Sequence, residues 1–137
     1  MEINVNKFAP LLLGSALLLS ACNDQEDQVE DRIEEQAEQS AQESGHTPVA
    51  LGLTERQLLD AEILAADGTE LGDVEAVTKD ADGNATELLI EVEDSDPDRY
   101  VAIPIDGLTV TTRGNDTDLS SEMTMEDIGS LPDAQIL

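Results

Sequence analysis

From Val49 onward, apolar and polar side chains alternate along short stretches of the chain. The clearest stretch is residues 85–93, in which Leu88, Ile90 and Val92 fall on one side, and Glu87, Glu91 and Glu93 fall on the other together with Leu89. A period of two is that of a β-strand with one buried face. This stretch therefore predicts a strand that packs its aliphatic face into a core.

Comparable stretches recur about every ten residues, with turn-forming residues between them. Asp67-Gly68 is a strong signal for a tight turn between two of the strands, and Val77 breaks the alternation of the next strand, which predicts a β-bulge. Short strands at this spacing predict one small all-β domain over residues 49–137. The expected strands are residues 62–65, 71–79, 85–93, 100–103, 108–112 and, more weakly, 117–121.

Two short helices are expected beside these strands. Thr54-Glu55-Arg56-Gln57 has the form of a capping box, which predicts a helix through Leu59. Thr124 precedes acidic residues that would lie in a first helical turn, which favours a second helix ending before Pro132.

Residues 23–48 differ from the rest because they are rich in acids and offer little to bury. High charge with low hydrophobicity predicts a disordered tether, and a flexible coil of these 26 residues would span roughly 28 Å. A faint helical stripe runs through it, too thin to fold alone, although a partner surface could turn it into a helix. The stripe consists of Val29, Ile33, Ala37 and Ala41.

An apolar segment of 12 residues, 8–19, lies near the start of the chain and leads into Leu19-Ser20-Ala21-Cys22. It is too short to cross a hydrocarbon core, which needs about 20 residues, and it has the length of the apolar region of a signal peptide. The last four residues resemble a lipobox, the sequence at which bacterial lipoproteins receive a diacylglyceryl group. The resemblance implies that residues 1–22 are a signal peptide with its lipobox ending at Cys22, and that the thiol of Cys22 carries lipid. The alternative is an ordinary secretory signal with an incidental cysteine.

A lipidated Cys22 would anchor the protein to a membrane of the bacterial cell envelope, facing the periplasm. Two or more acyl chains suffice for stable anchoring. The next residues, Asn23-Asp24, leave open whether the membrane is the inner or the outer one. Because Cys22 is the only cysteine, lipidation leaves no thiol for a disulfide, a zinc site or a nucleophile.

The formal net charge is −26, and it stays at −26 without residues 1–22, which hold one acid and one base. Phosphate binding needs clustered Lys and Arg, so a nucleic acid is excluded as a partner. The same sign argument excludes direct electrostatic attachment to anionic lipids. Two interpretations of the acidity remain open: adaptation to saline surroundings, where salt screens self-repulsion, or an acidic surface that attracts a basic partner or divalent cations.

A series of short motifs follows in order along residues 49–137: Ile63-Leu64, Asp67-Gly68, Leu71-Gly72-Asp73-Val74, Leu88-Leu89-Ile90-Glu91-Val92 and Tyr100-Val101-Ala102-Ile103-Pro104. Together they resemble the PRC-barrel domain, found in the H subunit of photosynthetic reaction centres and in a ribosome maturation factor. The resemblance implies a small, antiparallel, strongly bent barrel of about six strands with short flanking helices. It also implies a docking module, and no catalytic residue.

Candidate cation ligands are few. Asp80-Ala81-Asp82-Gly83-Asn84 superficially resembles an EF-hand loop, but glycine is fourth rather than sixth, so a plain turn is expected. Asp94, Asp96 and Asp98 could gather a cation weakly, although a solvated charge run is the simpler interpretation. His46 has no second histidine or cysteine to complete a transition-metal site.

Nothing in the sequence predicts an enzyme or a cofactor. Ser120 and Ser121 have no histidine base in the expected domain, and no single carboxyl can be chosen as a general acid. The first hypothesis is therefore a non-enzymatic, lipid-anchored module that binds a protein partner. The second is an acidic envelope protein that binds or buffers cations or protons through diffuse carboxylates.

Overall fold

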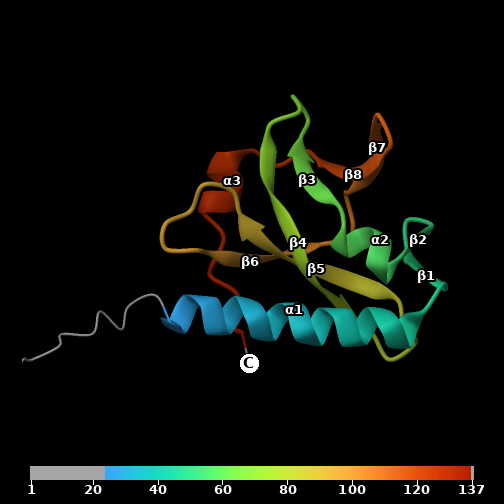
Figure 1. Cartoon of the computed structure of the whole chain (residues 1–137). Helices are drawn as coiled ribbons and strands as arrows, with labels where there is room; N and C mark the ends of the chain where they lie inside the picture. The colour runs from blue at the N-terminus through green and yellow to red at the C-terminus, as the bar shows by residue number, and fades with distance from the viewer. Residues whose placement is uncertain (1–23, 137) are drawn as a thin grey trace, which may run out of the picture.

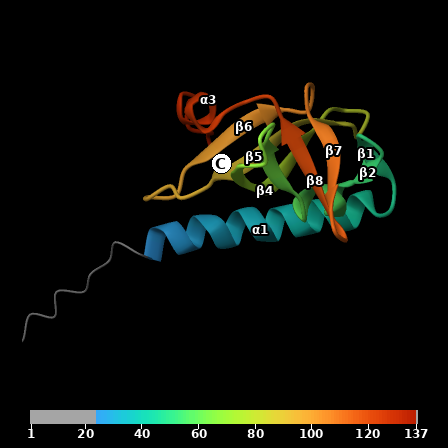
Figure 2. The same cartoon turned by 90° about the horizontal axis from the view of Figure 1, so that it is seen from above.

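The structure, a computed structural model, describes residues 24–136. A six-stranded sheet forms its centre, and a long helix lies along one side of that sheet (Figures 1 and 2). The helices are α1 (Asp24–Ser44), α2 (Glu55–Leu59) and α3 (Met125–Gly129). The strands are β1 (Pro48–Ala50), β2 (Leu53–Thr54), β3 (Glu62–Ala65), β4 (Glu70–Lys79), β5 (Ala85–Val92), β6 (Tyr100–Pro104), β7 (Thr109–Arg113) and β8 (Asp116–Ser121).

The expectation of a small domain built mostly from strands, with short flanking helices, is confirmed, but the closed antiparallel barrel is not. The sheet has the order β6-β5-β4-β3-β8-β7, and β1 and β2 pair separately. The sheet is mixed, because β8 runs parallel to β3, with Ile63 opposite Leu119. It is open, because β6 and β7 form its two edges and no ladder joins them in the described part of the chain.

The local signals placed most elements correctly. Thr54 and Thr124 each form a complete capping box, with Gln57 and Asp127 as the reciprocal partners. The Asp67-Gly68 turn joins β3 to β4, and Gly68 has a φ of +87°, which suits glycine. A register irregularity in β4 leaves Glu75 as an extra residue between Val74 and Ala76, slightly before the position where the alternation breaks.

The core lies on one face of the sheet and is aliphatic. Leu58 of α2 and Ile128 of α3 are fully buried in it, together with Ile63, Leu88 and Leu119 of the sheet. β4 and β5 approach closely at Gly72, where a Cβ atom would lie 2.0 Å from the carbonyl oxygen of Glu91. Only glycine permits that approach, so Gly72 helps to bend the sheet over its core.

The expected disordered tether is wrong for residues 24–44, which form α1 (Figure 1). The faint stripe becomes a packed face: Ile33, Ala37 and Ala41 are buried. They do not join the main core cluster, and α1 packs on β4 and α2. The partner surface that turns this segment into a helix is therefore the domain's own sheet, a long-range contact that the composition of the segment does not reveal.

Among residues 24–136, no helix combines the length and the apolar character that crossing a membrane requires. The predicted signal peptide and the predicted lipidation of Cys22 lie outside the described residues.

Candidate functional site

Glu75 of β4 lies within the electrostatic influence of acidic side chains from α1 and β5, and we call this group the α1 seam: Glu30 and Glu34 of α1, Glu75 of β4 and Glu91 of β5. The bulge places Glu75 in this seam as a half-buried side chain. Burial, followed by the charges of Glu91, Glu34, Asp73 and Glu30, raises the pKa of Glu75 to about 7. The pKa of Glu91 is also raised, first by burial and then by acidic neighbours that include Glu30.

Tyr100, at the start of β6, shares this environment. Its side chain is buried, and burial together with the charges of Glu91, Glu75 and Glu30 raises the pKa of the phenol. The phenol therefore remains protonated at physiological pH. The seam can take up a proton on Glu75 near neutral pH, but it offers no strong base or nucleophile.

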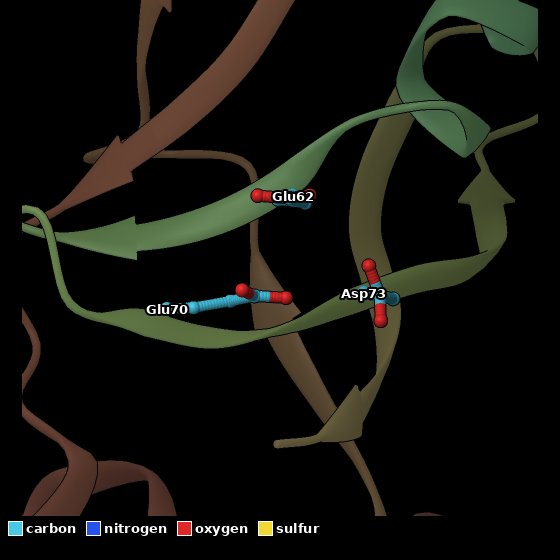
Figure 3. A group of neighbouring side chains, drawn as sticks. All are labelled: Glu62, Glu70 and Asp73. Atoms are coloured by element: carbon cyan, nitrogen blue, oxygen red, sulfur yellow. The ribbon is translucent and has the colours of Figure 1, made fainter.

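A second acidic group, which we call the acidic triad, consists of Glu62, Glu70 and Asp73. Glu62 lies on β3 opposite Asp73 of β4, and Glu70 extends along β4 toward Asp73 (Figure 3). One ligand atom from each residue lies within 4.8 Å of the others. A set of carboxylate oxygens at this spacing suits a hard cation such as Ca²⁺.

Electrostatics in the acidic triad both favour and oppose a cation. Burial, then Glu62, Glu93 and Asp73, raises the pKa of Glu70; burial and then Glu62 raise the pKa of Asp73. A bound cation would relieve this repulsion. Arg113 already pairs with Glu62, and its Nε donates to Asp118 at 2.7 Å, so one carboxylate of the triad has a cationic partner.

A buried ion pair fastens the end of α1 to the domain. Lys79 Nζ donates to Glu55 Oε2 and to Ser44 Oγ, each at 2.6 Å, and Ser44 Oγ donates to the same carboxylate oxygen. The Glu55 side chain is 1% exposed, and its Oε1 has no hydrogen-bond partner among the described residues. Burial alone would raise the pKa of Glu55, but its hydrogen bonds and the charge of Lys79 lower it.

A mainly apolar groove of about 390 Å³ lies between the first turns of α1, the loop before β6 and the C-terminal tail. Val29, Pro97, Tyr100, Ala134 and Ile136 supply its apolar lining. Glu26, Asp98 and Asp133 lie beside them, together with Arg99, whose Nε donates to Asp133 at 2.7 Å. The volume falls within the range of about 300–1,000 Å³ used by small-molecule ligands, and acidic side chains outnumber the single arginine in its lining.

Of the residues singled out from the sequence, Asp98 borders the apolar groove, and none belongs to the acidic triad or the α1 seam. Asp80 accepts hydrogen bonds from the backbone N–H groups of Asp82 and Asn84 at 3.0 and 2.9 Å, so the expected plain turn is confirmed. Asp94, Asp96, Asp98 and His46 are exposed. The buried Ser121 accepts a hydrogen bond from the N–H of Met123 at 3.1 Å.

Sequence reasoning missed the acidic triad and the α1 seam. The triad could have been found by pairing β3 with β4 across the Asp67-Gly68 turn, because that register sets Glu62 opposite Asp73. No local signal could have revealed the seam, since it depends on α1 packing against the sheet.

A comparison with the models of known protein families finds none that matches the chain, and a comparison with curated proteins likewise finds no match.

Proposed function

We propose that this protein is a lipid-anchored, non-enzymatic module of the bacterial cell envelope that binds or assembles with protein partners. The lipid is carried by Cys22, and the folded part faces the periplasm. We also propose that the bent sheet is a PRC-barrel-like fold in which the edge strands β6 and β7 do not pair. The motifs that resemble this family of docking modules support this proposal.

The observation that carries the proposal is the position of α1. The helix begins at Asp24, two residues after Cys22, and two residues span at most about 7 Å. Because α1 packs against the sheet, a lipid on Cys22 would hold the domain close to the membrane instead of on a long flexible tether. The apolar groove is lined by the first turns of α1 and would lie at this anchored end.

The test is the intact mass of the natively expressed protein, purified from membranes. We expect a chain that begins at Cys22 and carries the added mass of acyl groups, and a Cys22→Ser variant that keeps its leader and is not lipidated. An uncleaved leader or an unmodified thiol at Cys22 in the native protein would contradict the proposal. Crosslinking in intact membranes would then identify the protein partner.

The acidic triad favours a second candidate function, the binding of divalent cations. Calorimetric titration of the protein with CaCl₂ would show saturable heat in the range of about 10⁻⁴–10⁻³ M that is typical of extracellular calcium modules. A Glu70→Gln variant should lose this heat, and Glu87→Gln, which removes an exposed charge from β5, should keep it. Equal heat from both variants would count against a site at the triad.

A further inference from the structure

The two edges of the sheet are protected differently. β6 stops at Pro104, and the C-terminal tail covers part of it, because the N–H of Ala134 donates to the carbonyl of Tyr100 at 2.7 Å. β7 pairs with β8 alone in the described part of the chain. It contains no proline, lysine or bulge, which are common devices that prevent an edge strand from pairing, and its one charged side chain, Arg113, is paired with Glu62 and Asp118 of its own sheet.

The register shows which backbone groups β7 leaves available. The hairpin closes on Arg113 and Asp116 around a two-residue loop, and Gly114 in that loop has a φ of +62°. The two residues that flank such a loop exchange backbone hydrogen bonds with each other. Along an antiparallel ladder, pairs of this kind alternate with pairs that do not exchange hydrogen bonds. The N–H and C=O groups of Val110 and Thr112 are therefore directed away from β8.

The surroundings of this edge also suit a partner strand. Val110 is 43% exposed, although Leu119 opposite it is fully buried, so the aliphatic face of the sheet continues onto β7 without cover. Residues 107–115 contain no acid, and Arg113 is their only charge. In a chain with a net charge of −26, this edge is a place where two copies can approach with little local repulsion.

We propose that β7 pairs antiparallel with β7 of a second copy about a twofold axis. With Thr111 on the axis, Val110 of each copy lies opposite Thr112 of the other. Both outward N–H groups and both outward carbonyls of each strand then find partners, and the interface is the same patch on both copies, as twofold symmetry requires. This inference deepens the proposed binding function, and only its membrane setting rests on the lipid anchor.

The test uses the full chain in detergent micelles and measures its oligomeric state by light scattering over a range of NaCl concentrations. We expect a monomer–dimer equilibrium that shifts toward the dimer as salt screens the net charge. Val110→Lys should weaken the dimer by about tenfold or more. The matched control is Leu51→Lys, because Leu51 is the other exposed large apolar residue of the described part and the change in charge is identical.

A second measurement uses engineered thiols. Thr111→Cys should crosslink rapidly between copies under mild oxidation, whereas Thr86→Cys, on the interior strand β5, should not. Peptide mapping separates this crosslink from any disulfide at Cys22, so failed lipidation cannot be mistaken for failed pairing. The proposal is overturned by a monomer at every salt concentration, by a dimer that Val110→Lys leaves intact, or by a dimer that Thr111→Cys does not crosslink.

Discussion

The ion pair between Glu55 and Lys79 joins α2 to β4, and Ser44 attaches the end of α1 to the same pair. Removing one partner of a buried pair leaves the other charge without compensation. Lys79→Met should therefore lower the free energy of unfolding by about 3 kcal/mol. Urea denaturation would measure the loss. The double variant Lys79→Met/Glu55→Gln should recover part of it, and a double variant no better than the single one would contradict this account.

Glu75 makes the opposite contribution, because its pKa is raised in the folded state to about 7. An acid with a raised pKa favours the folded state fully below its unfolded pKa of 4.5. That contribution is lost as the pH rises toward about 7. Glu75→Gln should therefore remove its share of the decline in stability over this window and stabilise the protein at pH 8 by roughly 1–2 kcal/mol. Thermal unfolding from pH 4 to 8 would measure it, with Glu87→Gln as an exposed control that leaves the slope unchanged.

At the scale of elements, α1 depends on its contact with the sheet. Its sequence is strongly acidic and supplies only a thin apolar stripe, so most of its stability must come from packing. Ile33 is 5% exposed, and Ile33→Ala should cost about 2 kcal/mol. Because α1 lies outside the main core cluster, we expect the loss first as faster hydrogen exchange of α1 amides. Glu35→Ala, on the exposed side, should change the exchange little; equal effects of both variants would exclude the packing explanation.

The difference between local signals and contacts between distant segments explains what the sequence could predict. The capping box at Thr54, the N-cap at Thr124, the turn at Gly68 and the alternation in β5 are local signals, and the structure confirms them. The docking of α1 and the parallel pairing of β8 with β3 depend on contacts between distant segments. The composition of residues 24–44 shows how little they offer to bury, but it could not show that the sheet supplies a surface for them to pack on.

For the whole molecule, the main question is how the net charge of −26 affects stability. Acidic groups that repel one another meet in both the α1 seam and the acidic triad. The Debye length falls from about 10 Å at 0.1 M salt to about 3 Å at 1 M, so added salt should weaken repulsion across and between these groups. Folding concentrates the charge, and screening should therefore favour the folded state.

We expect the thermal midpoint of the full chain to rise by about 5–10 °C between 0.1 and 1 M NaCl, which corresponds to roughly 1–2 kcal/mol for a domain of this size. Sucrose at equal osmolality is the control, because it stabilises by exclusion from the protein surface without screening charge. Glu75→Gln should show a smaller rise with NaCl than the wild type, since one source of repulsion is already gone. A midpoint that does not respond to NaCl would mean that the negative charges lie too far apart to oppose folding.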